Sequence, residues 1–296
     1  MRRLSMAAVI LVVPQCLFAQ AADAIRMIDE LHELGQYEES RTLALGAVAT
    51  ASAVEKDELY WRAARAVVGL GDAAEDRKES RDAILSIFEQ GERYADMAIA
   101  ADPQNSLGYY WKSANIGRWG QVKGILSSLA AAAPMRELLV KDLSLDAGHP
   151  EAYHVLGTLH RELPGSPLSF GNADAAVSLG RMAVDLHAEA FAAGRVKAFN
   201  YSYSLYLAKS LWKRNWSAAN RASGRQKKQA AWQAAKTPLE RGSAYEAAVQ
   251  LGAVSDRAEA RQIVTWIIAE LSKMTTRTAG QDSDLAEARG TLAGWK

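Results

Sequence analysis

Residues 149–186 read HPEAYHVLGTLHRELPGSPLSFGNADAAVSLGRMAVDL, and this stretch decides the predicted fold. Pro150 has no backbone N–H and suits the first turn of a helix. Four residues then recur at the spacing of one helical face, namely Tyr153, Leu156, Gly157 and His160. The Pro-Gly-Ser-Pro run at 164–167 predicts a loop. Asn172 is suited to cap a second helix, whose inward side chains would be Ala176, Leu179, Met182, Ala183 and Leu186.

A helix–turn–helix with an aromatic residue three positions before a Leu-Gly pair is the pattern of a tetratricopeptide repeat. Gly157 has no side chain, so we expect the two helices to approach closely there. Tyr153 is expected to fill the space between neighbouring hairpins. One hairpin cannot bury its apolar face alone, and this stretch therefore predicts further hairpins on either side.

Hairpins of unequal length are predicted before this stretch, beginning at Ala22, near Glu55 and at Ser106. Their turns are predicted at Gly35, at Gly71-Asp72 and at Trp119-Gly120, because glycine permits unusual backbone dihedrals. The third hairpin carries extra length, with an Ala-rich piece and Pro134 ahead of its second helix.

After the central stretch, a fifth hairpin is predicted to begin with a helix at 199–214 and to continue with a partner helix in the 226–251 region. A last long helix at 256–273 would close the array, as terminal repeats must. We expect one tetratricopeptide-like helical domain over residues 22–275, followed by a polar, loosely held tail at 276–296.

The composition agrees with an all-α fold, a superhelix (α-solenoid) of degenerate tetratricopeptide-like hairpins. Hydrophobic residues make up 49% and charged residues 23% of the 296 residues, which is typical of a folded globular protein. Alternating β-branched residues are scarce, and this disfavours strands. The net charge of +1 argues against nucleic acid as a partner.

Residues 1–21 have the pattern of a secretory signal peptide. Arg2 and Arg3 precede an apolar run at 4–13, and Ala19-Gln20-Ala21 resembles a cleavage site. The predicted location is the periplasm or outside the cell. The alternatives are an uncleaved anchor, although ten apolar residues are short for about 30 Å of hydrocarbon, and an outer-membrane lipoprotein acylated at Cys16. A mature chain without this segment has no cysteine for a disulfide, thiol catalyst or thiolate metal site.

The runs YYWKSANIGRWGQ (109–121) and HPEAYHVLGTLHRELPGSPLSFGNADAAVSLGRMAV (149–184) resemble secreted tetratricopeptide proteins associated with TRAP transporters, the TatT type. The likeness covers residues 22–220. It implies an all-α, periplasmic or lipid-anchored, non-catalytic protein that partners the solute-binding subunit of a transporter. The weak lipidation signal at Cys16 and the basic segment at 190–239 depart from that family.

Motifs for catalysis and for cofactors are missing from the sequence, which has no His-Glu-x-x-His, Gly-x-Ser-x-Gly, P-loop or dinucleotide fingerprint. His149, His154 and His160 are spaced five and six residues apart, on no common helical face, so they predict no metal site. Ser210 and Lys213 match Ser-x-x-Lys, but the companion motifs of penicillin-recognising enzymes are absent. We therefore predict a protein that is not an enzyme and uses no metal or cofactor.

Charge is distributed unevenly along the chain. Residues 23–102 hold eighteen acidic and nine basic residues, whereas residues 190–239 hold ten basic and no acidic ones, with aromatic residues interleaved. Two interpretations stay open. The basic segment could bind an anionic ligand, a lipid headgroup or an acidic partner, or it could be a solvated face that balances the acidic N-terminal half.

The concave side of stacked hairpins is the usual binding surface of repeat proteins. Counting from each packing aromatic residue, the predicted binding residues are Trp61, Arg65, Tyr110, His154, Thr158, Arg161, Lys209 and Trp212. Trp, Tyr and Arg are the residue types that carry binding energy at interfaces. The alternative is that several of these side chains pack against neighbouring helices.

The sequence thus predicts a secreted protein that binds a partner protein in a groove. The alternative is a carrier of a small apolar or anionic ligand inside the helical superhelix. Repeat folds host many functions, so this last step depends on analogy.

Overall fold

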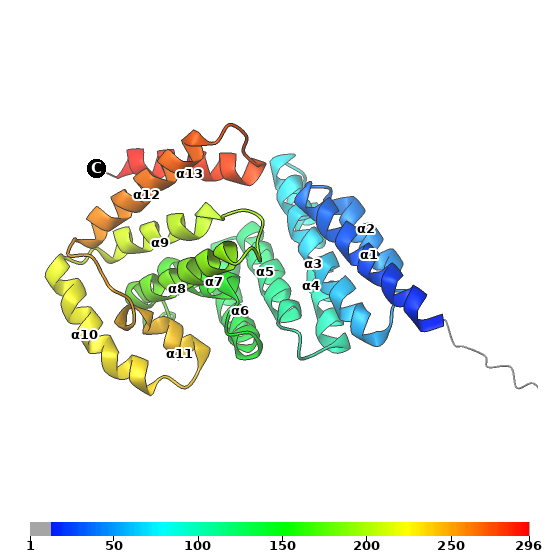
Figure 1. The fold of residues 1–296 in the computed structure, drawn as a ribbon, viewed down its shortest axis with the longest axis horizontal. Helices are drawn as coiled ribbons and strands as arrows, with labels where there is room; N and C mark the ends of the chain where they lie inside the picture. The colour runs from blue at the N-terminus through cyan, green and yellow to red at the C-terminus, as the bar shows by residue number, and fades with distance from the viewer. Residues whose placement is uncertain (1–12, 296) are drawn as a thin grey trace, which may run out of the picture. The chain divides into compact units, whose positions relative to one another are not determined.

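The computed structural model describes residues 13–295, with side chains described from Ala22 onward. This part of the chain forms thirteen α-helices and one short 3₁₀ helix, and it contains no β-strand. Consecutive helices pack on one another as hairpins (Figure 1), which confirms the predicted all-α, α-solenoid-like fold. None of the described helices is long and apolar enough to span a bilayer.

The described residues fall into two compact units, one within residues 1–138 and the other within 139–296. The helical domain predicted over 22–275 stays a prediction. We call the two units the N-terminal unit and the C-terminal unit. The first contains α1 (Val13–Glu33), α2 (Tyr37–Ala47), α3 (Ala53–Asp76), α4 (Arg81–Ala101), α5 (Ser106–Lys123) and the first part of α6 (Ile125–Leu145). Within it α3 packs against α2, α4 and α5.

The first hairpin, α1–α2, has the predicted turn. Gly35 adopts φ +74°, a left-handed conformation that favours glycine. The hydroxyl of Ser40 donates to the backbone oxygen of Ile28 at 3.0 Å, and Ile28 packs in a buried cluster with Ala44 and Leu59. Residues 1–12 of the predicted signal peptide lie outside the described residues, so the signal peptide stays a prediction.

Two other predicted turns are wrong, because their glycines lie inside helices. Gly71 is within α3, which continues to Asp76, and a Cβ there would lie 2.2 Å from the ring of Phe88 in α4. Gly120 is within α5, where a Cβ would lie 3.2 Å from Ala131 of α6. Both glycines permit close packing between helices and do not reverse the chain. Pro134 also lies inside a continuous α6, where a break was expected.

The C-terminal unit holds the last part of α6 and the remaining helices: α7 (Pro150–Glu162), α8 (Ala173–Ala192), α9 (Tyr201–Arg214), α10 (Ala218–Ala234), α11 (Pro238–Ser243), the 3₁₀ helix η1 (Tyr245–Ala247), α12 (Asp256–Lys273) and α13 (Ala279–Gly294). The α7–α8 hairpin is as predicted. Asn172 caps α8 by accepting hydrogen bonds from the backbone N–H groups of Asp174 and Ala175. A Cβ on Gly157 would lie 3.2 Å from the backbone oxygen of Ala176, so the two helices do meet closely there.

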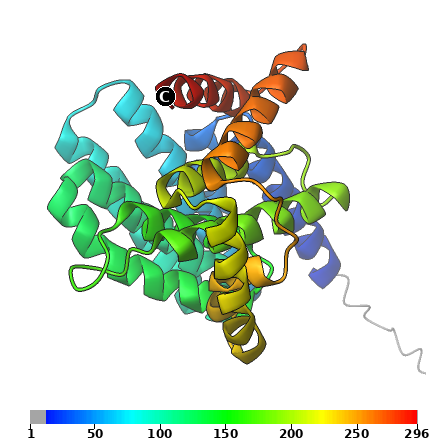
Figure 2. The ribbon, with the colours of Figure 1, turned by 90° about the vertical axis from the view of Figure 1, so that its left-hand side faces the viewer.

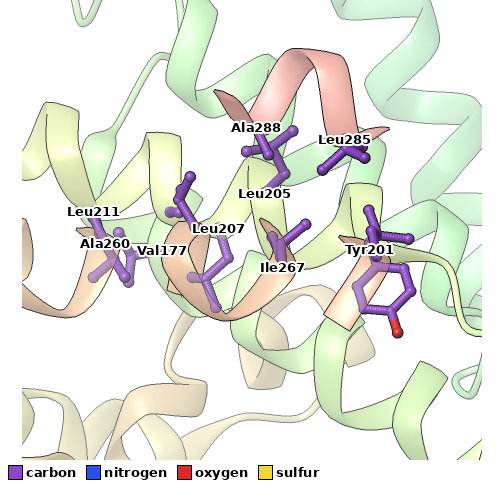
Figure 3. Packing of buried hydrophobic residues seen from close by; sticks show 12 residues of the cluster. Val177, Tyr201, Leu205, Leu207, Leu211, Ala260, Ile267, Leu285 and Ala288 are labelled. Carbon is purple, nitrogen blue, oxygen red and sulfur yellow. The ribbon is translucent and has the colours of Figure 1, made fainter. Parts of the chain in front are cut away.

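The core of the C-terminal unit is a cluster of apolar side chains between α9, α12 and α13 (Figure 3), including Leu205, Leu211, Val264, Ile267, Leu271 and Leu285. The helices that pack along α9 are therefore α8 and α12, and the predicted partner in 226–251 is wrong. In that region α10 contacts η1 and α11 instead.

The segment expected to be a loose tail forms α13. Thr278 caps this helix together with Gln281, and Leu285 and Ala288 are buried against the core. Figure 2 shows the α12–α13 hairpin from a second side, where it runs from orange to red. Trp295 follows α13, and its ring is stacked on Trp212 with 4.3 Å between centroids. Apolar contacts, which the polar composition obscured, hold this segment in place.

Candidate partner-binding site

The eight predicted binding residues are divided between the two units. The N-terminal unit holds Trp61, Arg65 and Tyr110, and the C-terminal unit holds His154, Thr158, Arg161, Lys209 and Trp212.

In the N-terminal unit Trp61 is a core residue, because only 6% of its surface is exposed. The guanidinium carbons of Arg62 and Arg65 lie 4.0 and 5.2 Å from the centre of its ring. Arg65 also donates to the carboxylate of Asp29 at 2.6 Å. Tyr110 is half-buried. Arg65 thus joins α3 to α1, and the buried ring of Trp61 packs against the two arginines of α3, which matches the packing alternative.

In the C-terminal unit three predicted residues converge on a residue that sequence reasoning missed, Tyr206. The ring of His154 lies 4.8 Å from that of Tyr206, centroid to centroid. The Arg161 guanidinium carbon lies 4.8 Å and the Lys209 Nζ 5.0 Å from the centre of the same ring. We call these four residues the Tyr206 cluster. Attraction between a cation and an aromatic face contributes about 0.5–1 kcal/mol at exposed sites and more when desolvated.

Helical spacing explains how these side chains reach one point. His154 and Arg161 are two turns apart on α7, and Tyr206 and Lys209 are one turn apart on α9. Arg161 donates to the backbone oxygen of Tyr206 at 3.1 Å, which ties the two helices together. Lys209 pairs with Glu287 of α13. Thr158 lies on α7 between His154 and Arg161, and its buried hydroxyl has no hydrogen-bond partner within the described residues.

The cluster carries its positive charge on Arg161 and Lys209 alone. Burial, and then the nearby positive charge of Arg161, lowers the pKa of His154 to about 4, so its imidazole is neutral at pH 7. Burial and the charge of Glu287 raise the pKa of Tyr206, so its phenol keeps its proton. A half-buried aromatic ring flanked by two cations can recognise acidic or aromatic groups of a partner.

Trp212 belongs to a separate arrangement on α9. Its ring is stacked on Trp295, and the guanidinium carbons of Arg257 and Arg261 lie 4.6 and 5.2 Å from its centre. Both arginines are exposed. Trp212 therefore anchors the C-terminal end of the chain to α9 and α12.

The basic segment at 190–239 is only partly a solvated face. Arg214, Arg221 and Lys228 are buried in the C-terminal unit. Arg214 donates to Glu246 at 2.5 Å and to Asp256 at 2.8 Å, and Lys228 donates to Glu246 at 2.8 Å. These three charges are balanced by carboxylates inside the C-terminal unit, so the interpretation that they face solvent and balance the acidic N-terminal half is wrong.

The histidines considered as metal ligands have other partners. Nδ1 of His149 lies 2.8 Å from the carboxylate of Asp142. Burial would lower the pKa of His149, but the hydrogen bond and charge of Asp142 outweigh it and raise the pKa. His160 lies against the ring of Phe170. The described residues contain no group of three or more His, Cys, Asp or Glu placed to hold a metal ion.

The fold and the cluster define an all-α protein of consecutive helical hairpins with a half-buried tyrosine between a buried arginine of α7 and a lysine of α9, and each of these two cations is paired with a carboxylate. A family model described as regulator of microtubule dynamics protein 1-3 matches residues 24–166, slightly less than half of the chain. The chain is similar to that family over α2 to α7 and part of α1. The curated proteins include no match to this chain. The matched family differs from the transporter-associated one, whose resemblance stays an expectation.

Proposed function

We propose that this chain is a secreted, non-enzymatic helical-repeat protein that binds a partner protein in the periplasm through the Tyr206 cluster. The observation that carries this proposal is the convergence of Arg161, His154 and Lys209 on one half-buried tyrosine ring. Tyr and Arg are enriched among the residues that dominate binding energy at interfaces. The absence of catalytic motifs from the sequence supports a non-enzymatic role.

The resemblance of residues 109–121 and 149–184 to transporter-associated proteins supports the solute-binding subunit of a TRAP-type transporter as the partner. The name of the matched family refers to microtubule dynamics. That name describes those proteins and favours no particular partner for this chain.

The partner is tested by a pull-down with residues 22–296 from the periplasm and membranes of the native organism. We expect one captured protein, which Tyr206→Ala releases and Tyr206→Phe retains because the ring is kept. Tyr110→Ala is the matched control in the N-terminal unit and should leave capture unchanged. Circular dichroism would show that each variant is folded.

Three results would contradict the proposal. Capture that survives Tyr206→Ala but is lost in Tyr110→Ala would move the site to the N-terminal unit. If both variants still capture the protein but capture is lost at high salt, the binding site would lie on the exposed part of the basic segment. Capture of no protein at all would remove the partner-binding function.

Secretion is tested by the mass of the protein recovered from the native organism. We expect a chain that begins after Ala19 or Ala21 in the periplasmic fraction. An acylated Cys16 in the membrane fraction would instead establish the lipoprotein alternative.

A further inference from the structure

A cavity of about 490 Å³ lies in the C-terminal unit between α10 and the loop at 250–253. Its polar lining consists of two arginines, Arg221 and Arg225, and the carboxamides of Gln226, Gln229 and Gln250. Its apolar lining includes Ala218, Ala222, Leu251 and Ala253. None of these lining residues is acidic. This combination suits a small ligand with a negative charge at one end and a short apolar body.

The two arginines differ in how their charge is compensated. Arg221 is buried and already paired, because it lies beside Asp256 at 3.2 Å and donates to Glu259 and to the backbone oxygen of Val254. Arg225, one helical turn further on, takes part in no ion pair of the described residues. Its Nε is buried and lacks a hydrogen-bond acceptor there. A buried donor without an acceptor is unfavourable, and such groups often mark the place of a missing ligand.

The surroundings of Arg225 add to its positive potential. Ala218 begins α10, so the cavity includes the first turn of a 17-residue helix, where the helix dipole favours anions. The segment around α10 is rich in basic residues and contains no acidic one between positions 190 and 239. A carboxylate placed in the cavity would accept hydrogen bonds from Arg225 with no competing carboxylate in the lining.

We propose that this cavity binds a small organic carboxylate, whose carboxyl group pairs with the Arg225 guanidinium and whose apolar part contacts the alanines and Leu251. A guanidinium matches a carboxylate with two parallel hydrogen bonds, and the carboxamides of Gln226 and Gln250 supply further donors. The cavity is separate from the Tyr206 cluster and does not depend on the partner-binding proposal. It also differs from the ligand site predicted inside the helical superhelix, because it lies beside a single helix, α10.

Calorimetric titration of the purified protein with acetate, benzoate and 4-methylpentanoate tests this site. We expect 4-methylpentanoate to bind at least tenfold more tightly than its neutral amide, because a charge-assisted pair is lost in the amide. Arg225→Gln should weaken carboxylate binding by about tenfold or more. Lys227→Gln is the matched control, since this exposed neighbour on α10 does not line the cavity.

Thermal unfolding separates loss of the site from loss of the fold. Without ligand, Arg225→Gln should unfold at or above the wild-type temperature, because Arg225 has no ion-pair partner to lose among the described residues. With 4-methylpentanoate, only the wild type and Lys227→Gln should be stabilised. Arg225→Gln should still capture the partner protein in the pull-down. A failure of carboxylate binding can therefore be told apart from a failure of partner binding at the Tyr206 cluster.

The proposal is overturned by any of three results. The first is that none of the three carboxylates binds saturably in the millimolar range. The second is that the amide, or Arg225→Gln, gives the same affinity as the carboxylate with the wild type. The third is that inorganic phosphate binds at Arg225 and the carboxylates do not, which would assign the cavity to a different class of anion.

Discussion

Two helical glycines of the N-terminal unit have opposite surroundings, and they illustrate what a single residue contributes. Gly71 faces the ring of Phe88 so closely that a Cβ would lie 2.2 Å from it, whereas a Cβ on Gly46 would meet nothing within 4 Å. Glycine lowers helix stability through its backbone entropy. At position 71 the absence of a side chain offsets that effect, because it allows α3 and α4 to pack closely.

We therefore expect Gly71→Ala to lower the free energy of unfolding by about 1–3 kcal/mol, as over-packing does. Gly46→Ala should leave it unchanged or raise it by up to about 1 kcal/mol. Urea denaturation followed by circular dichroism measures both variants. Equal effects at the two positions would show that the contact with Phe88 does not explain Gly71.

The lowered pKa of His154 predicts that the stability of the C-terminal unit depends on pH. His154 binds a proton near pH 6.5 in the unfolded chain, but its pKa is about 4 in the folded protein. The unfolded state thus binds more protons between these values, and stability falls as the pH is lowered from 6.5 to 4. The free energy of unfolding should fall by on the order of 3 kcal/mol in total over this pH range.

The neutral variant His154→Gln should reduce this pH dependence. Urea denaturation at pH 7 and at pH 4.5 measures the free energy of unfolding of both proteins. The acidic residues are the same in both, so their contribution to the pH dependence cancels when the two proteins are compared. If wild type and variant lose the same stability between the two pH values, the lowered pKa of His154 is wrong.

At the scale of elements, α13 shows how a segment of polar composition is held in place. Its contacts are few and specific: Leu285 and Ala288 enter the core, Glu287 pairs with Lys209, and Trp295 is stacked on Trp212. These contacts join the last helix to α9 and α12. The segment therefore completes the core of the C-terminal unit.

Trp295→Ala should destabilise the C-terminal unit by about 0.5–1.5 kcal/mol for the lost ring pair, together with the apolar area that it exposes. Ser283→Ala, on the exposed side of α13, is the control and should have almost no effect. Amide hydrogen exchange should become faster in 279–294 for Trp295→Ala alone. Unchanged exchange would mean that α13 is held without the tryptophan pair.

At the scale of the whole molecule, the net charge of +1 gives no sign that many of the charged residues form an internal ion-pair network. Glu246 of η1 lies at its centre and accepts hydrogen bonds from Arg181 of α8, Arg214 of α9 and Lys228 of α10. The charges come from positions up to 65 residues apart and are almost fully buried. The network connects four elements of the C-terminal unit.

Glu246→Gln should lower the free energy of unfolding by up to about 3–5 kcal/mol. It removes the carboxylate that three cations share and leaves each with its other carboxylate partner, which is Glu259 for Arg181, Asp256 for Arg214 and Asp174 for Lys228. Glu270→Gln, which removes a more exposed pair with Lys273, should cost less than about 1 kcal/mol. Chemical denaturation measures both variants. Similar costs would show that burial does not strengthen the network.

The same network predicts sensitivity to acid. Burial opposes ionisation of Glu246, but the hydrogen bond from Arg214 and the nearby cations lower its pKa to about 2. Its stabilising contribution is therefore complete above the usual value of 4.5 and is lost as the pH falls toward 2. When Glu246→Gln is unfolded by acid, it should lack the loss of stability that Glu246 causes in the wild type. The same dependence of stability on pH in both proteins would contradict the lowered pKa of Glu246.

The sequence by itself determined the features that depend on near neighbours in the chain. The all-α fold, the α7–α8 hairpin and the cap at Asn172 follow from periodicity, breakers and capping side chains within a few residues. The same reasoning placed His154, Arg161 and Lys209 among the predicted binding residues, because helical spacing is a local property.

Only the tertiary structure decided the features that join distant positions. Gly71 looks like a turn residue in the sequence, but the ring of Phe88 makes it a packing residue. The helices α8 and α12 both pack along α9, and the carboxylates that neutralise Arg214 come from positions 174, 246 and 256. Tyr206 became the centre of the candidate site because α7 and α9 lie side by side, and no local pattern records a contact made across 45 residues or more.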